Sequence, residues 1–275
     1  MNPSKITLGT IELPSYSATG WSFRDLVDWW GQTADKAEIV ERPQGHGAFP
    51  ARGSLRPSRA ISFIANCING SQAAVESGFD DLSSVGAEGP VLMTVETPAG
   101  ASWRVVKVES VKPTHHRGGS RYGVLAVDLI APDPRRYATG SLLSTGPAVA
   151  STGLVWSTVW PLVWPGGGSS GRVILTNSGK APSAPSFRLQ GPFTSALISC
   201  VETGARIGFN RPVPAGSVVE ISGKRAVIDG QSDVSRWLLF REWADVPPGS
   251  SRTYQFDAVA GAGAVMQGKV DSAWW

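Results

Sequence analysis

The order of hydrophobic and polar positions predicts short strands over most of the chain. The clearest case is Arg121 to Ile130, where side chains alternate between two faces and Leu125 and Leu129 fall on the same one. A period of two is typical of a strand buried on at least one face. Pro132 and Pro134 follow, and because proline lacks the N–H that a sheet needs, we expect the strand to end there and an exit segment to begin.

One helix is predicted in the first half. Asn69 or Ser71 can cap its N-terminus, and Val75, Phe79 and Leu82 recur at helical spacing on one apolar stripe. The other apolar runs are rich in β-branched and aromatic residues, which favours strands. These runs are Ile6 to Leu13, Ala60 to Ile68, Val91 to Glu96 and Trp103 to Val111.

Two further segments of the first half give weaker patterns. Trp21 to Gly31 carries an apolar cluster that fits a turn of helix and a strand equally, and both interpretations stay open. Lys112 to Gly119 is polar and contains Pro113, so we expect a loop there.

The second half shows short strands separated by turn signals. Ser222-Gly223, between two alternating runs, is the strongest two-residue hairpin signal. No helix interrupts the series, so the fold class that we predict is mainly β, and a jelly-roll or galectin-like sandwich of two antiparallel sheets fits the second half best. The predicted strands of the second half are Arg172 to Thr176, Ser186 to Leu189, Leu197 to Val201, Arg206 to Phe209, Ser217 to Ile221, Lys224 to Ile228, Trp237 to Arg241 and Arg252 to Phe256.

An uncharged stretch separates the halves. It contains Trp156, Trp160 and Trp164 and ends in a glycine-rich run, while Pro161 argues against a helix. Because three exposed tryptophans would leave a large apolar patch in water, we expect an extended strip that packs between domains or on a partner. The predicted organisation is a first domain over 1–140, a connector over 141–171 and a sandwich over 172–275.

Composition agrees with two β-rich domains. The chain has 275 residues, of which 41% are hydrophobic and 17% charged, with 32 glycines and 20 prolines. The first 140 residues hold as many basic as acidic side chains, so a nucleic-acid-binding face is not indicated. Arg52, Arg56 and Arg59 form a small basic run without acidic neighbours, but prolines interrupt it and a solvated loop is the simpler interpretation.

Motifs for catalysis, cofactors or metals are not found. The three histidines, His46, His115 and His116, have no carboxylate or serine context, and Cys67 and Cys200 lie in different halves as expected buried thiols. We therefore expect no enzyme activity, no cofactor and no metal. The N-terminus lacks the apolar core of a signal peptide, and no apolar run is long enough to cross a bilayer.

A glycan-binding module is the alternative prediction. Sandwiches of this class bind sugars by stacking them on exposed aromatic rings, and Trp237 and Trp243 are the candidate platforms. For each of them a structural role in the core or at a turn is the competing interpretation.

The whole string of features resembles the distal tail protein family of bacteriophages with long, non-contractile tails, whose members are also called minor tail proteins. The resemblance rests on the order and spacing of many short motifs along nearly the full chain. They are Trp21 and Trp29, Arg42 to Phe49, Arg59 to Phe63, Ala131 to Tyr137, Gly153 to Trp156, Trp160 to Pro165, Asn177 to Gly179, Ala184-Pro185, Leu189 to Pro192, Gly204 to Ile207, Ile228 to Gly230 and Pro247 to Gly249.

The resemblance implies a structural component of the virion at the distal end of the phage tail, made in the bacterial cytoplasm. It also implies an N-terminal tail-tube-like β domain with one short helix, followed by a C-terminal galectin-like (jelly-roll) sandwich. Six copies would form a ring around a channel for genome passage, so DNA would be only a transient guest and no membrane insertion is expected. The implied partners are the tail tube protein, the hub protein, and the tape measure and receptor-binding or fibre proteins. Residue roles follow more loosely. The candidate interface residues are Gly45, His46, Gly47, Ala48, Phe49, Arg52, Arg56, Arg59, Trp274 and Trp275.

Overall fold

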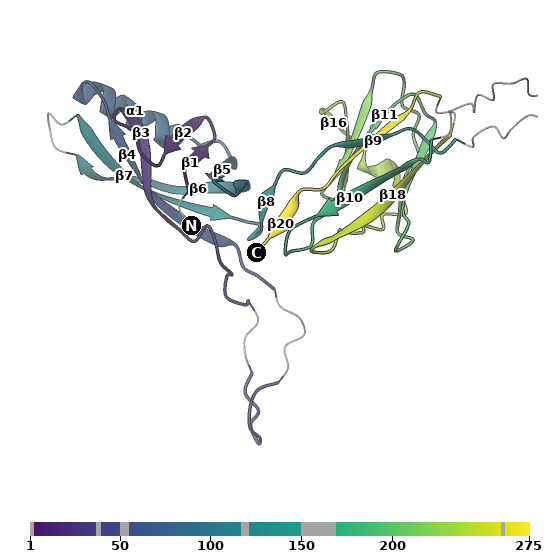
Figure 1. Ribbon diagram of the computed structural model, residues 1–275, viewed down its shortest axis with the longest axis horizontal. Coiled ribbons are helices and arrows are strands. Elements are labelled where there is room, and N and C mark those ends of the chain that lie inside the picture. Colours follow the sequence, from purple (N-terminus) through teal and green to yellow (C-terminus); the bar gives the residue numbers. More distant parts are fainter. Residues whose placement is uncertain (1–2, 37–39, 50–54, 117–120, 150–168, 260–261) are drawn as a thin grey trace, which may run out of the picture. The chain divides into compact units, whose positions relative to one another are not determined.

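The computed structural model describes residues 3–36, 40–49, 55–116, 121–149, 169–259 and 262–275 (Figure 1). The chain divides into two compact units, Met1–Ala138 with Trp274–Trp275, and Thr139–Ala273. The first crossing between the units follows directly on the exit segment that Pro132 and Pro134 predict. Strands dominate both units, which confirms the mainly β fold class.

A single antiparallel sheet builds the first unit. Its path is β2-β1-β5-β6-β7-β4-β3, with β8 paired to β6 and to β20. The predicted alternating strand is confirmed as β7, which pairs with β4 over its whole length. The strands of this unit are β1 (Lys5–Leu8), β2 (Ile11–Pro14), β3 (Gly20–Val27), β4 (Arg59–Ile68), β5 (Val91–Thr97), β6 (Gly100–His116), β7 (Tyr122–Ala131) and β8 (Arg136–Ala138), and β20 (Ser272–Trp274) ends on it.

The predicted helix is confirmed as α1 (Gln72–Ser84), with Ser71 as its N-cap. The Ser71 hydroxyl accepts a hydrogen bond of 3.2 Å from the Ala74 amide, which satisfies one of the free N–H groups at the helix start. Val75 and Leu82 on this helix are fully buried, and α1 lies against the sheet of the first unit (Figure 1). A Cβ at Gly123 of β7 would lie 2.2 Å from the Phe79 ring, so the sheet needs glycine where the helix packs on it.

Two segments of the first unit settle questions that the sequence leaves open or predicts wrongly. Gly20–Val27 is strand β3, so the strand interpretation of the Trp21 segment is the right one. The loop predicted over Lys112 to Gly119 is wrong for its first five residues, because β6 continues to His116. The pairing of β6 with β7 contains two register shifts, one of them between Pro113 and His115. A bulge there lets the sheet accept a proline without losing its partner strand.

Two antiparallel sheets build the second unit as a sandwich. Within the described residues the orders are β10-β18-β12-β13-β17 and β16-β15-β14-β11-β19-β9. The inward side chains of both sheets form one core, in which the rings of Phe187 and Tyr254 meet edge to face with centroids 5.1 Å apart. The strands are β9 (Leu143–Thr145), β10 (Arg172–Asn177), β11 (Ser186–Gln190), β12 (Ser195–Cys200), β13 (Arg206–Phe209), β14 (Val218–Ser222), β15 (Arg225–Ile228), β16 (Ser232–Asp233), β17 (Leu238–Leu239), β18 (Ser250–Val259) and β19 (Val265–Lys269).

The second unit differs from the predicted strands at three places. The segment Trp237 to Arg241 is not one strand: a 3₁₀ turn, Ser235–Trp237, precedes the two-residue β17. Strand β9 lies in the range 141–171 and pairs with β19, so part of that range belongs to a sheet. Strand β19 itself is missing from the sequence prediction, because Gly268 and Gln267 weaken its apolar alternation.

Candidate assembly site

A long excursion leaves the sheet of the first unit between β3 and β4, and we call residues 28–58 the arm (Figure 1). Its two limbs pair with each other: the Lys36 amide donates to the Leu55 carbonyl at 2.8 Å, and the Phe49 amide donates to the Val40 carbonyl at 2.9 Å. At the tip, the Arg42 amide donates to the Gly47 carbonyl at 3.0 Å. The described residues of the arm thus form a ribbon that turns back on itself, and they contain no named strand.

Apolar side chains on the arm face water. Val40, Phe49 and Leu55 are 58%, 56% and 71% exposed. The Arg42 guanidinium lies over the Phe49 ring, at 5.8 Å from its centroid. The predicted interface residues Gly45 to Phe49 all belong to this tip, where Ala48 is half-buried and the others are exposed. Arg52, another predicted interface residue, lies outside the described residues. The tip therefore combines backbone order with exposed hydrocarbon, which is typical of a surface that a partner covers.

Arg59 holds the base of the arm. The side chain is only 3% exposed, and its guanidinium donates to the carbonyls of Asp28 at 2.9 Å, Trp30 at 3.2 Å and Gly31 at 2.7 Å. Burial lowers the pKa of Arg59, while the nearby Asp28 carboxylate acts in the opposite direction. The sequence predicts Arg59 as an interface residue, but its guanidinium donates hydrogen bonds to carbonyls of its own chain.

Arg56 has a similar place higher on the arm. Its guanidinium donates to the Thr33 carbonyl and so ties the outgoing limb to the returning one. The side chain is half-buried, unlike that of Arg59. Arg52 lies outside the described residues and Arg59 is buried, so Arg56 is the arginine of the predicted basic run that the structure shows partly accessible to solvent.

Arg104 joins the arm base to the exit segment. It is 1% exposed and donates to the Trp29 carbonyl at 2.7 Å and to the Pro134 carbonyl at 3.3 Å. Its guanidinium also lies 4.4 Å from the Trp29 ring centroid, a cation–π contact in a desolvated site. Burial first, and then repulsion from Arg59 and Arg136, lower the pKa of Arg104 to about 9.

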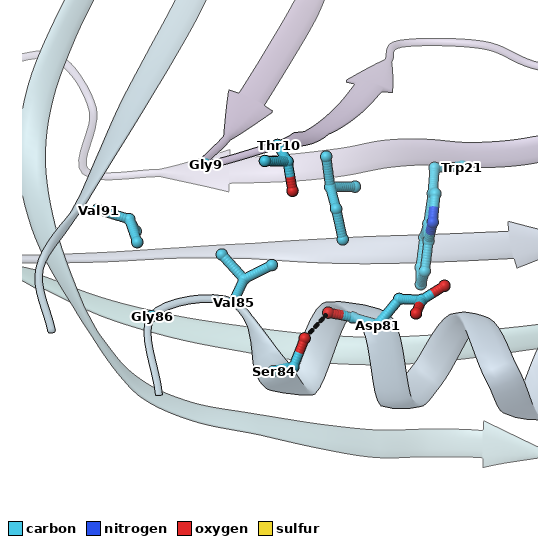
Figure 2. Close-up of a pocket in the computed structure, with 9 residues that line it drawn as sticks. Gly9, Thr10, Trp21, Asp81, Ser84, Val85, Gly86 and Val91 are labelled. Atoms are coloured by element: carbon cyan, nitrogen blue, oxygen red, sulfur yellow. Dashed lines mark hydrogen bonds between the residues drawn. The ribbon is translucent and has the colours of Figure 1, made fainter. Parts of the chain in front are cut away.

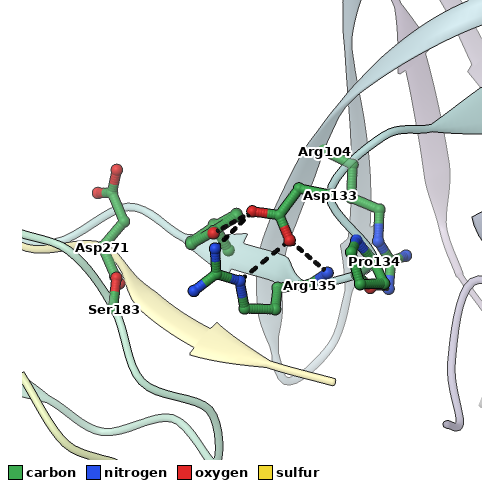
Figure 3. Close-up of polar contacts among 7 residues, drawn as sticks. Arg104, Asp133, Pro134, Arg135, Ser183 and Asp271 are labelled. Atoms are coloured by element: carbon green, nitrogen blue, oxygen red, sulfur yellow. Dashed lines mark hydrogen bonds and ion pairs between the residues drawn. The ribbon is translucent and has the colours of Figure 1, made fainter. Parts of the chain in front are cut away.

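Asp133 is the carboxylate nearest to these arginines, and it is already engaged (Figure 3). Its oxygens accept hydrogen bonds from Arg135 Nη2 at 2.8 Å, Arg135 Nε at 3.0 Å and the Tyr137 hydroxyl at 2.7 Å. Burial alone would raise the pKa of Asp133, but the hydrogen bonds from Arg135 and Tyr137 outweigh it and lower the pKa. The exit segment is therefore an ordered turn with a satisfied anion.

The terminal tryptophans lie beside the same segment. The Arg136 guanidinium lies 5.0 Å from the Trp274 ring centroid, and Trp274 is half-buried. Trp275 is 37% exposed. On the other side of β8, the rings of Trp103 and Tyr137 stack with centroids 4.9 Å apart. An aromatic and guanidinium cluster therefore surrounds the chain where it leaves the first unit.

A cavity of about 500 Å³ lies elsewhere in the first unit, between α1, β3 and the turn from β1 to β2 (Figure 2). Trp21 and Val85 supply its apolar wall, and Asp81 is the only carboxylate among its lining residues. The Ser84 hydroxyl donates to the backbone carbonyl of Asp81 at 2.7 Å and not to a side chain that could activate it as a nucleophile. This arrangement lacks the convergent acid, base or nucleophile that catalysis requires.

The predicted aromatic sites have different settings. Trp156, Trp160 and Trp164 lie outside the described residues. Trp237 is 36% exposed, and the Arg236 guanidinium lies 5.3 Å from its ring centroid. Trp243 lines an open cavity of about 520 Å³ in the second unit. Trp237 does not line this cavity, so the two tryptophans do not form one binding platform there.

Metal and membrane features can be assessed within the described part of the chain. No group of three or more metal-ligating side chains converges there. No helix among the described residues has both the length and the apolar character that a bilayer crossing needs. Cys67 and Cys200 are both buried and free, as the sequence predicts.

Comparisons with known proteins identify the fold. No protein-family model matches the chain, and no curated protein matches it in sequence. Solved structures do match over both units. The Dit protein of phage SPP1, described as a paradigm of the hub adsorption apparatus in phages that infect Gram-positive bacteria, superposes with a TM-score of 0.64 at 10% identity, covering 98% of this chain and 99% of that one.

Two structures of the phage p2 baseplate in its activated conformation match as well. The structure with calcium gives a TM-score of 0.58 at 13% identity, over 98% of this chain and 97% of the baseplate chain. The structure with strontium gives 0.55 at 13% identity, over 97% and 96%. The chain therefore has the complete two-unit fold of phage tail-tip proteins, at an identity too low to transfer residue roles.

Arg104 is the residue that sequence reasoning missed. In Trp103 to Val111 it occupies the same face as Ser102 and Val106, and all three are buried. A charged residue on the buried face of an alternating strand signals an internal anchor, because burying a lone guanidinium is costly unless carbonyls receive its hydrogens. The partners could not be predicted, since the Trp29 and Pro134 carbonyls come from segments far apart in sequence.

Proposed function

We propose that this protein is a distal tail protein of a long-tailed bacteriophage, a structural and non-enzymatic component of the virion at the distal end of the tail. The observation that carries the proposal is the likeness to the SPP1 Dit protein, which extends over 98% of this chain. A shared fold alone does not supply a function. The exposed arm adds a feature of this chain itself, because ordered backbone with exposed Phe49 and Val40 suits a permanent interface.

In this proposal the first unit, which contains most of the predicted domain 1–140, is the tail-tube-like domain that forms a hexameric ring around a channel for the genome. Subunits in a cyclic ring meet through two different patches, so an arm can reach a neighbour without being self-complementary. The arm tip, Gly45 to Phe49, with Arg52 and Arg56, contacts the next subunit or the hub. Arg59 then serves the interface indirectly, by holding the arm base in place.

The remaining parts have peripheral roles in the same assembly. The second unit, Thr139–Ala273, forms a galectin-like sandwich outside the ring and includes β9 from the range 141–171. The rest of that range connects the domains, and we assign Trp156, Trp160 and Trp164 to packing between them. Trp274 and Trp275 complete the aromatic cluster at the exit from the first unit and dock against a neighbour. The tail tube and hub proteins are the direct partners, and the tape measure and fibre proteins are further ones.

Substitution on the arm tests this proposal against a matched surface position. Phe49→Asp removes a side chain that is 56% exposed in the arm, and Ile174→Asp changes one that is 58% exposed on β10 of the sandwich. Both variants keep the fold because neither side chain is in the core. We expect the first to lose ring assembly, measured by mass photometry and negative-stain electron microscopy with the tail tube and hub proteins, and the second to retain it.

Two results would count against the proposal. A wild-type protein that stays monomeric with both partners present, at micromolar concentration, contradicts the ring. Rings formed equally by the Phe49→Asp and Ile174→Asp variants leave the ring intact but remove the arm from its interface. Circular dichroism of each variant verifies that the fold is retained.

A further inference from the structure

The cavity around Trp243 in the second unit has the composition of a ligand site. It measures about 520 Å³, within the usual range for small-ligand pockets. Trp243 packs partly on the sandwich core, and its indole N–H has no hydrogen-bond partner within the described residues. Three charged side chains, Lys224, Asp245 and Arg252, line the same cavity.

These three charged side chains line one cavity without pairing with one another. Other charged side chains of the second unit do pair, such as Arg225 with Asp233 at 2.7 Å and Lys269 with Asp271 at 2.9 Å. Lys224, Asp245 and Arg252 make no ion pair and no side-chain hydrogen bond within the described part of the chain, although they share one cavity. Unused donors and acceptors that converge beside an aromatic ring are the polar fixing points of a binding site.

The walls of this cavity are held rigidly without a ligand. The Tyr254 hydroxyl donates to the Ala244 carbonyl at 2.7 Å, which fixes the backbone directly after Trp243. The Val246 amide donates to the Ser183 carbonyl at 2.8 Å, so the next part of the wall is bridged to a second segment. Pro182, Pro247 and Pro248 add fixed backbone angles at the rim. A ligand would therefore meet a preorganised surface and would not have to order a loop.

We propose that this cavity binds a saccharide that carries an anionic group, either a carboxylate or a phosphate. A sugar ring has an apolar face of C–H groups that packs on the Trp243 indole, while Asp245 accepts from ring hydroxyls. Two cations against one carboxylate leave a net positive site, and Arg252 supplies the planar donor pair that matches a carboxylate or phosphate. The inference does not depend on the ring-forming function, because the cavity belongs to the second unit alone.

Titration calorimetry of the full-length protein tests the proposal with defined probes. They are oligogalacturonate as a uronic acid, poly(glycerol phosphate) as a phosphate polymer, chitotetraose as a neutral sugar and an oligoglutamate as an acidic peptide. We expect one of the two anionic saccharides to bind with a dissociation constant of about 1 mM or lower, and the preferred one identifies the anion. Added salt weakens this binding because the site attracts its ligand by charge.

Variants locate the binding. Arg252→Gln weakens it by about tenfold or more, as expected when a charged hydrogen-bond donor is lost, and Trp243→Phe weakens it while preserving an aromatic ring in the wall. Trp237→Ala and Arg188→Gln are the matched controls on the same unit and leave binding unchanged, since neither residue lines the cavity.

Several outcomes overturn the proposal. No heat from any saccharide at about 10 mM means that the cavity is not a sugar site, because binding that weak is not specific. Equal binding of chitotetraose that Arg252→Gln does not change removes the anionic group from the proposal. Binding of oligoglutamate that depends on Trp243 and Arg252, with no saccharide bound, makes the site one for an acidic peptide instead.

Discussion

Each unit contains a buried polar side chain that joins segments distant in sequence, and these two side chains, Asn177 and Arg104, differ in charge. In the second unit, the neutral Asn177 is 0% exposed and uses every group of its amide. Its Nδ2 donates to the carbonyls of Ala181 at 2.8 Å and Val246 at 3.1 Å, and its Oδ1 accepts from the amides of Gly179 at 2.9 Å and Ala273 at 3.2 Å. In the first unit, the buried anchor is the cation Arg104.

The hydrogen-bonding groups of Arg104 are less completely paired than those of Asn177. Two carbonyls receive its hydrogens and its Nε has no partner, while burial first and then two further arginines lower its pKa. A buried charge with incomplete pairing contributes little to stability, yet it can fix which segments meet. The difference indicates that the sandwich is a self-sufficient scaffold, whereas the first unit retains internal charge in order to hold the arm base against the exit segment.

The largest effect is expected from Asn177→Leu. The substitution leaves the Ala181 carbonyl and the Gly179 and Ala273 amides without this partner and removes one of two donors from the Val246 carbonyl. The free energy of unfolding of the second unit therefore falls by about 4 kcal/mol. Urea unfolding of the full chain, followed by pulse-labelling hydrogen exchange, reports each unit separately. Peptides of the first unit should be unaffected.

Ser178→Ala is the control for this change, because Ser178 is the exposed neighbour in the same turn. It should alter the unfolding free energy of the second unit by less than about 0.5 kcal/mol. A loss under about 1 kcal/mol for Asn177→Leu would mean that water replaces the amide and that the sandwich does not depend on a single anchor.

Arg104→Met is expected to have a smaller effect, in the other unit. The Trp29 and Pro134 carbonyls lose their donor, but a costly desolvated charge disappears as well, so the net loss for the first unit is about 2 kcal/mol. Local hydrogen exchange of the arm base should rise more than that of β7. The same urea and exchange experiment measures both quantities.

Lys107→Met provides the matched control on the same strand. Lys107 is exposed, and its ion pair with Glu109 spans 3.7 Å at the surface. Its replacement should change little, since exposed pairs contribute little. If Arg104→Met stabilised the first unit, the buried guanidinium would lower stability and serve only to fix which segments meet. The contrast with the stabilising Asn177 would then be larger.

Features that depend on local sequence could be predicted, whereas features that depend on contacts with another element could not. Strand β7, helix α1 and most sandwich strands could be predicted because hydrophobic period and caps are local properties of the chain. The loop assigned to Lys112 to Gly119 was wrong because a bulged pairing with β7 overrides the local signal of Pro113. Gly123 shows the same limit, since its need for glycine comes from Phe79 on another element.

The sites were predicted less well than the fold, for a related reason. Phe49 and Trp243 are recognisable in the sequence as unusual residues, but exposure on an arm and the lining of a cavity depend on segments brought from elsewhere. Arg59 shows the converse, because it reads as part of a surface basic run and is buried at the arm base. Burial of a cation depends on carbonyls whose position no local pattern contains.

The smallest expected effect tests whether the exit segment adds stability through charge. The folded pKa of Asp133 lies below its ordinary value of 3.8, so its contribution is complete above that value and is lost as the pH falls through the folded pKa. Because the side chain is 42% exposed, the contribution is below about 1 kcal/mol. The difference in unfolding free energy between wild type and Asp133→Asn should therefore shrink from pH 6 to about pH 3. A difference that stays constant over this range would assign the effect to hydrogen-bond geometry rather than charge. The buried guanidinium groups, and not the Asp133 carboxylate, would then distinguish the first unit from the second.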